Sequence, residues 1–236
     1  ARNSAARRTV STTVAPYFPT SSAIVTRRGA RIWRVARKRR AGENQKPGWK
    51  LRRAGRTWRG ARRTGNALMA VCRPFVFANF RLYEGRDSYS LASAEVKNYF
   101  TELAADVEAA CYGSYFLEFA DYYGRENVEG EELLLLLYQS LRALLKPAIP
   151  NSLVQLVFEL RAMTINGEYT AYPPDPVSES AVYAWEFIIS SPLEKLYTFV
   201  LKEAVQRELQ ECVEINKRRF LDREFKSLGI LRELGG

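Results

Sequence analysis

The chain has 236 residues and a hydrophobic content of 47%, which is enough for one large or two small globular domains. Its net charge of +10 is unevenly divided: residues 1–73 hold 20 Arg or Lys against one acid, whereas residues 74–236 hold 16 against 25, so nucleic acid is the first partner that the charge predicts. The chain has no histidine, and Cys72, Cys111 and Cys212 are widely spaced, so we expect no metal, no cofactor and no histidine general base.

The first segment, residues 1–42, contains no acid and is rich in Arg, Ser and Ala. This composition is typical of a transit peptide or of a disordered nucleic-acid-binding arm. Apolar clusters with β-type composition nevertheless occur at residues 9–18, 23–25 and 32–35. Because the Arg-Arg-Gly sequence at residues 27–29 is a turn-like spacer, the last two clusters predict a short hairpin.

Further strand fragments are predicted at residues 49–51 and 57–58, followed by a strand over residues 71–82 that Pro74 interrupts. Leu51 is the only leucine among residues 1–66, so these segments can bury only a small core. Together they indicate a small β-barrel that carries many arginines.

The basic side chains of this region are the candidate nucleic-acid contacts. A run such as residues 37–40 repels itself too strongly to be kept only as a solvated face, so we favour contact with phosphates. Trp33, Trp49 and Trp58 lie among the arginines and either stack on unpaired bases or form the core of the β domain. The candidate DNA-binding residues are Arg31, Arg34, Arg37, Lys38, Arg39, Arg40, Arg52, Arg53, Arg62 and Arg63.

After Asp87 the apolar residues recur at helical spacing, which predicts an all-α part. A helix is expected to start at a Ser93 N-cap, and a final helix at Ser191-Pro192 is expected to continue to the basic residues 217–219. The helices between them are predicted at residues 111–122, 131–144, 152–163, with a Ser152 capping box, and around 182–189, after a proline loop at 172–176.

No catalytic constellation is recognisable in the sequence. It contains no Walker phosphate loop and no dinucleotide-binding glycine fingerprint, so we do not expect an enzyme. No apolar run approaches the ~20 residues of a membrane span, so we expect an intracellular protein with no membrane contact.

Several segments share the motifs of one family in the same order. They are residues 60–66 (GARRTGN), 74–84 (PFVFANFRLYE), 92–96 (ASAEV), 115–119 (YFLEF), 158–168 (FELRAMTINGE) and 225–231 (FKSLGIL). Over about residues 59–234 the chain thereby resembles RecO, the bacterial recombination mediator.

This resemblance implies an N-terminal OB-type barrel, a helical C-terminal domain, binding of single- and double-stranded DNA, and strand annealing. It also implies docking to RecR and to the C-terminal tail of single-strand-binding protein, help in loading the recombinase, and a cytoplasmic, nucleoid-associated location in a bacterium. By the match of residues 60–66, Arg62 and Arg63 correspond to the basic strand segment that the family places near DNA.

The chain departs from the family pattern in two places. Many members carry a four-cysteine zinc module after the segment that ends at Glu168, whereas here the proline loop follows without cysteine, so zinc is not expected. Residues 1–58 lack the alternating strands of the family's barrel start, and their Arg, Ala, Gly and Trp excess also resembles an out-of-frame translation of a GC-rich gene.

We therefore predict an α+β multidomain fold, with a small N-terminal OB-type β-barrel that is either complete, incomplete or disordered, followed by an all-α helical domain. Residues 1–58 would be a basic, poorly ordered or degenerate barrel start, residues 59–87 the remaining OB-type strands, and residues 88–236 the helical domain. The leading interpretation is a non-enzymatic DNA-repair mediator. The alternative is a helical protein-interaction module with a disordered basic nucleic-acid-binding arm.

Overall fold

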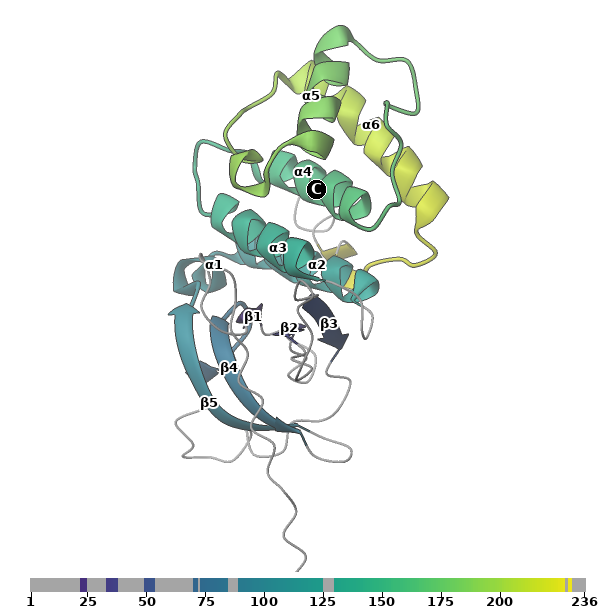
Figure 1. Cartoon of the computed structure of the whole chain (residues 1–236). Coiled ribbons are helices and arrows are strands. Elements are labelled where there is room, and N and C mark those ends of the chain that lie inside the picture. The colour runs from purple at the N-terminus through teal and green to yellow at the C-terminus, as the bar shows by residue number, and fades with distance from the viewer. Residues whose placement is uncertain are drawn as a thin grey trace, which may run out of the picture. The chain divides into compact units, whose positions relative to one another are not determined.

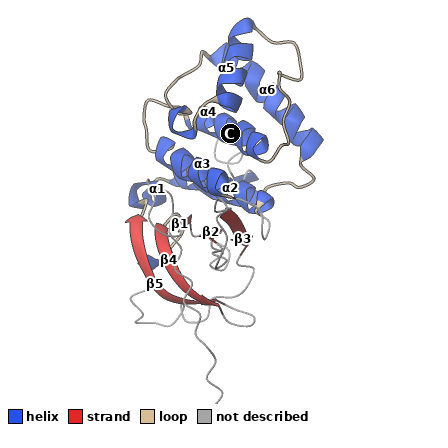
Figure 2. Cartoon of the chain, in the orientation of Figure 1, coloured by secondary structure: helices blue, strands red, loops and turns tan. Residues whose placement is uncertain are grey.

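The computed structural model describes residues 22–24, 33–37, 49–53, 70–71, 73–84, 89–124, 130–227 and 229–230. The chain divides into two compact units, Ala1–Phe100 with Gly124–Leu134, and Thr101–Tyr123 with Leu135–Gly236. The described strands belong to the first unit and most of the helical residues to the second (Figure 1, Figure 2). An α+β fold with a helical C-terminal part is thus confirmed.

Two antiparallel sheets make up the described part of the first unit. One has the order β1 (Ser22–Ile24), β4 (Phe77–Glu84), β5 (Tyr89–Asn98), and the other pairs β2 (Trp33–Arg37) with β3 (Trp49–Arg53). Residues 75–80 are all buried. Because β4 is paired on both sides and begins within this buried run, it anchors the core of the unit.

The predicted clusters at residues 23–25, 32–35 and 49–51 overlap strands, but the hairpin predicted between the first two is wrong. β1 pairs with β4, and β2 pairs with β3. Pairing with β4, whose first residues are buried, prevails over a short turn-like spacer. The predicted fragments at residues 9–18 and 57–58 lie outside the described residues. The five described strands lie in two sheets, so an OB-type barrel stays a prediction.

The helix predicted to begin at Ser93 is also wrong, because Tyr89–Asn98 is strand β5. Within this strand Ser93, Glu95 and Lys97 are exposed while the residues between them are half-buried, which is the period of a strand. The chain then turns at Phe100, whose φ is 47° and whose N–H donates to Asn98 Oδ1 at 2.8 Å. A left-handed residue interrupts a helix, so the apolar spacing that continues past Phe100 does not belong to one element.

The second unit is a helical bundle with α4 at its centre. Its elements are α1 (Thr101–Ala105), α2 (Val107–Tyr123), α3 (Glu131–Ala143, whose first residues belong to the first unit), α4 (Asn151–Ile165), α5 (Glu179–Ser190), the short 3₁₀ helix η2 (Leu193–Lys195) and α6 (Glu203–Phe220). Helix α4 contacts α2, α5 and α6, and its residues are buried on almost every side (Figure 1). Its apolar sequence therefore follows from its central position.

Two of the predicted helix starts are wrong. Helix α4 begins at Asn151 after Pro150, so Ser152 is not its N-cap; the Ser152 hydroxyl instead accepts a hydrogen bond from Gln206 at 2.8 Å. Ser191-Pro192 leads only to η2, and α6 starts at Glu203. The predicted helices over α2, α3, α4 and α5 are confirmed.

Contacts around Tyr197 explain why η2 does not continue directly into a longer helix. The Tyr197 hydroxyl is buried and lies 2.5 Å from the Ser140 hydroxyl, and its backbone carbonyl accepts a hydrogen bond from Lys146 at 3.3 Å. Thr198 Oγ1 donates to the carbonyl of Lys195 at 2.7 Å. The side chains of Lys146 and Thr198 thus bind the carbonyls of Tyr197 and Lys195, which a continuing helix would need. In the described part of the chain, no helix is both long and apolar enough to cross a bilayer.

Candidate functional site

The structure describes the backbone of four of the ten predicted DNA-binding residues. Arg34 and Arg37 lie in β2, and Arg52 and Arg53 lie in β3. The other six lie outside the described residues; they are Arg31, Lys38, Arg39, Arg40, Arg62 and Arg63. The strand pair β2–β3 is therefore the part of the candidate nucleic-acid interface that can be examined.

The register of β2 and β3 sets basic residues opposite one another. Arg34 is the partner of Arg52, Trp33 is the partner of Arg53, and Arg37 is the partner of Trp49. Opposed residues of an antiparallel pair share one face of the sheet, and like charges at such positions destabilise the pair. A bound polyanion would relieve this repulsion.

A second candidate site lies in the helical unit, where three of the six sequence motifs meet. The motif at 115–119 is on α2, the motif at 158–168 begins on α4, and the motif at 225–231 follows α6. Phe116 stacks on Phe158 with ring centroids 4.3 Å apart, and Phe119 stacks on Phe225 at 4.9 Å. Motifs far apart in sequence thus form one aromatic cluster, as residues of a shared core do.

A buried ion pair lies beside these rings. Glu159 on α4 is fully buried, and its Oε1 accepts hydrogen bonds from Lys217 Nζ at 2.9 Å, the Tyr115 hydroxyl at 2.5 Å and Gln155 Nε2 at 2.8 Å. Lys217 also contacts Glu214 at 2.8 Å. Three donors on one oxygen compensate for much of the cost of burying a carboxylate.

The pKa directions in this network follow from burial and charge. Burial opposes the charged form of Lys217, but the carboxylates of Glu159 and Glu214 outweigh it, so the pKa of this lysine is raised. Burial and the nearby Glu159 charge hold the pKa of Tyr115 well above its usual range. Both groups keep their protons at neutral pH, so the network is suited to holding α2, α4 and α6 together rather than to proton transfer.

The segment after α6, residues 222–227, is named the strap here because it lies along α2. Glu118 on α2 accepts hydrogen bonds from the backbone N–H of Ser227 at 3.0 Å and from its hydroxyl at 2.9 Å. The Tyr122 hydroxyl donates to Asp222 at 2.9 Å, and Arg223 lies 3.5 Å from Glu118. The ring of Phe225 is buried against α2.

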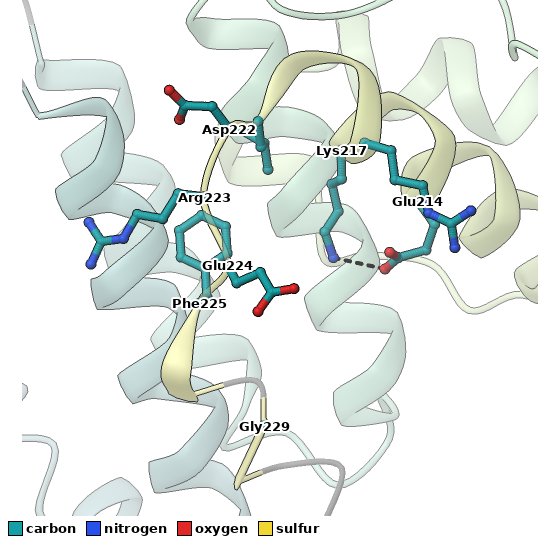
Figure 3. Close-up of a pocket in the computed structure, with 9 residues that line it drawn as sticks. Glu214, Lys217, Asp222, Arg223, Glu224, Phe225 and Gly229 are labelled. Carbon is teal, nitrogen blue, oxygen red and sulfur yellow. Dashed lines mark hydrogen bonds and ion pairs between the residues drawn. The ribbon is translucent and has the colours of Figure 1, made fainter.

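A hollow of about 460 Å³ separates the strap from the end of α6. Figure 3 shows Arg223, Glu224 and Phe225 on one side of it and Lys217 and Glu214 on the other. The complete lining is Glu214, Lys217, Arg218, Leu221, Asp222, Arg223, Glu224, Phe225 and Gly229. Three of these side chains are cationic and three are carboxylates, so the hollow has no strong preference for either sign of charge.

Polar contacts hold the proline loop that follows Glu168. The Thr170 carbonyl accepts a hydrogen bond from Trp185 Nε1 at 3.1 Å, and the N–H of Ser178 donates to Glu208 at 2.8 Å. Within the described ranges, no three metal-ligating side chains converge. Cys212 is buried and Cys111 is half-buried, while Cys72 is outside the described residues. The loop is thus fixed at both ends by hydrogen bonds to side chains of α5 and α6.

Comparison with known proteins identifies the helical region. Residues 104–171 match the family model described as "Recombination protein O C terminal". This region is similar to the C-terminal part of RecO proteins. The DNA repair protein RecO of Alkaliphilus metalliredigens is 34% identical over 109 residues, and that of Caldicellulosiruptor bescii is 32% identical over 111 residues. The predicted resemblance to RecO is confirmed.

The extent of these matches differs between relatives. The first alignment covers 46% of this chain and 44% of the Alkaliphilus protein, and the second covers 47% and 45%. The chain therefore spans somewhat less than half of the length of these two RecO proteins. A longer match, to the DNA repair protein RecO of Acetivibrio thermocellus, is 22% identical over 210 residues and covers 75% of this chain and 83% of the relative.

Sequence reasoning missed the Glu159–Lys217 pair and the attachment of the strap to α2. One signal was present for the first: Glu159 is an acid within the apolar run of residues 156–160, a position that must face the core. Nothing local distinguishes Lys217 from its exposed neighbours Arg218 and Arg219, and its partner is 58 residues away.

Proposed function

We propose that the protein is a DNA-repair and homologous-recombination mediator that binds single- and double-stranded DNA and anneals complementary strands. The observation that carries the proposal is the RecO match of residues 104–171. The excess of 20 basic residues over one acid in residues 1–73 supports DNA as the ligand of the front part.

The DNA-binding role rests on the ten candidate basic residues. Arg34 and Arg52, which are opposed in the β2–β3 register, are the pair whose repulsion a phosphate would relieve. The tryptophans of the same two strands, Trp33 and Trp49, are suited to stacking on unpaired bases. Single-stranded DNA offers both phosphates and unpaired bases, so it can contact the arginines and the tryptophans at the same time.

The helical part is proposed to bind proteins. In the RecO interpretation its partners are RecR and the C-terminal tail of single-strand-binding protein, and together they help to load the recombinase. Residues 101–236, which contain the helices, are acidic, with 13 basic residues against 22 acids, and this disfavours DNA as the main ligand of the helical part. The protein would act without catalytic chemistry, in the bacterial cytoplasm at the nucleoid.

Strand annealing tests the proposal directly. The full chain should accelerate the pairing of complementary oligonucleotides, measured by fluorescence transfer, and the double variant Arg34→Glu/Arg52→Glu should lose most of this activity. The matched control Lys202→Glu/Arg207→Glu reverses two exposed charges at the start of α6 and should retain the annealing activity. Failure of the unmodified chain to anneal strands at low salt would refute the mediator function and favour the alternative, a helical interaction module with a basic arm.

A further inference from the structure

The register of β2 and β3 divides their residues between two faces of unlike composition. Alternate residues of a strand belong to opposite faces, and opposed residues of an antiparallel pair belong to the same face. One face, named the basic face here, holds the pairs Arg34–Arg52 and Ala36–Lys50. The other, named the tryptophan face, holds the pairs Trp33–Arg53, Val35–Leu51 and Arg37–Trp49. The strand pair thus separates its tryptophans from Arg34 and Arg52.

The tryptophan face has a Trp–Arg pair at each end and an apolar pair between them. Trp33 is opposed by Arg53 at one end, and Trp49 is opposed by Arg37 at the other. The two ends are four residues, or about 13 Å, apart along a strand. Indole rings and guanidinium planes both stack on unpaired bases. Each Trp–Arg pair therefore combines a surface for a base with a cation for a neighbouring phosphate.

The charges of the tryptophan face argue against burying that face in a protein core. Residues 1–100 contain 23 Arg or Lys against four acids, so carboxylates that could neutralise both Arg37 and Arg53 are scarce. Removing an unpaired charge from water is costly. A polyanion that lies on the face would supply the missing negative charge.

We propose that the two faces bind different forms of DNA: the tryptophan face takes single strands only, and the basic face takes the phosphates of single- or double-stranded DNA. This inference rests on the proposed DNA-binding function. The bases of a duplex are stacked on one another and offer the indole rings no free surface, whereas both forms offer phosphates. The proposal adds Lys50 to the phosphate contacts and makes Arg37 and Arg53 specific for single strands.

Substitution of both tryptophans tests the tryptophan face. In the full chain, Trp33→Leu/Trp49→Leu should weaken binding of a labelled single-stranded oligonucleotide at least about tenfold, because two stacking surfaces are lost. Binding of a duplex of the same length should be unchanged. The matched control Trp33→Phe/Trp49→Phe keeps two aromatic rings and should retain most of the single-strand affinity. Equal losses on both forms of DNA, or no loss on single strands, overturns the proposal.

Two charge substitutions on β3 give a measurement that keeps both tryptophans. Lys50→Gln removes one charge from the basic face, and Arg53→Gln removes one from the tryptophan face. Lys50→Gln should reduce the magnitude of the log–log salt slope by about 0.7 on single strands and about 0.9 on duplex. Arg53→Gln should reduce it by about 0.7 on single strands and leave the duplex slope unchanged.

The duplex slopes decide between the two faces. Equal duplex slopes for Lys50→Gln and Arg53→Gln contradict the division of DNA forms between the faces, while the proposed function stands as long as the unmodified chain binds DNA. Absence of any DNA binding by the unmodified chain at low salt would instead refute the proposed function, and this inference with it.

Discussion

Lys217 on α6 donates a hydrogen bond across 2.9 Å to Glu159 on α4, and both side chains are buried. A buried ion pair is costly to break from one side, because the remaining charge loses its counter-charge and has no water to replace it. In this pair the carboxylate is the more deeply buried member, so loss of the lysine is the more informative change.

Replacement of Lys217 by methionine should therefore lower the free energy of unfolding by about 3–5 kcal/mol. Urea unfolding, monitored by circular dichroism, measures this loss in the free energy of unfolding. The neighbouring exposed residue supplies the control, since Arg218→Met removes the same charge at the surface and should cost less than about 1 kcal/mol. Equal effects of the two substitutions would show that the buried pair contributes no net stability.

The attachment of the strap should depend on pH through Glu118. Burial alone would raise the pKa of this carboxyl, but the hydrogen bonds from Ser227 and Lys226 and the charge of Arg223 outweigh burial, so its pKa lies below the ordinary 4.5. A depressed pKa stabilises the folded state above the unfolded pKa, and this contribution is lost as the pH falls through the folded value.

We accordingly expect Glu118→Gln to lower the melting temperature at pH 7, and the difference from the unmodified chain to shrink below about pH 4.5. Differential scanning calorimetry between pH 3 and pH 7 measures this difference in melting temperature. Glu224→Gln, at an exposed position of the strap, serves as the control for the loss of one carboxylate from this region. A difference that grows on acidification would be inconsistent with a depressed pKa.

DNA affinity should fall steeply with salt. Each phosphate contact on a single strand contributes about 0.7 to the magnitude of the log–log slope. Arg34→Ala/Arg52→Ala should therefore reduce that magnitude by about 1.4, as measured by anisotropy of a labelled oligonucleotide at several salt concentrations. An unchanged slope would place the phosphate contacts elsewhere in the basic block.

Removal of metal should leave the protein unchanged. The proline loop is held by Trp185 and Glu208 through hydrogen bonds, so a chelator should not alter the melting temperature. Elemental analysis of the purified chain provides an independent measurement. Zinc in a one-to-one ratio would show that cysteines converge, with Cys72 the first to examine.

The sequence predicted the elements that local periodicity determines. Helices α2, α3 and α5 repeat their apolar residues over three turns or more, and the structure confirms them. The same reasoning failed at Ser93, where only a few apolar residues matched the helical spacing and a turn at Phe100 intervenes. It failed at Ser191 because Lys146 and Ser140, both distant in sequence, fix Tyr197 and end the helix early.

The candidate sites were predictable to different degrees. A basic interface follows from composition, and four of its residues prove to share the β2–β3 pair, although only the strand register shows that Arg34 is opposite Arg52. The pairing of Glu159 with Lys217 could not be predicted, because it depends on how α4 and α6 cross. Sequence spacing describes faces of single helices and does not specify which faces meet.

The hydrogen bonds between Glu118 and Ser227 join positions 109 residues apart. A ribosome makes a chain from its N-terminus, so α2 emerges long before the strap that covers its aromatic side. Tyr115 and Phe119 therefore stay uncovered by Phe225 until the residues that link α2 to the strap have also been made. The helical bundle completes this part of its core only once Phe225 has left the ribosome, and a chain that stops before the strap would expose an aromatic surface that favours aggregation.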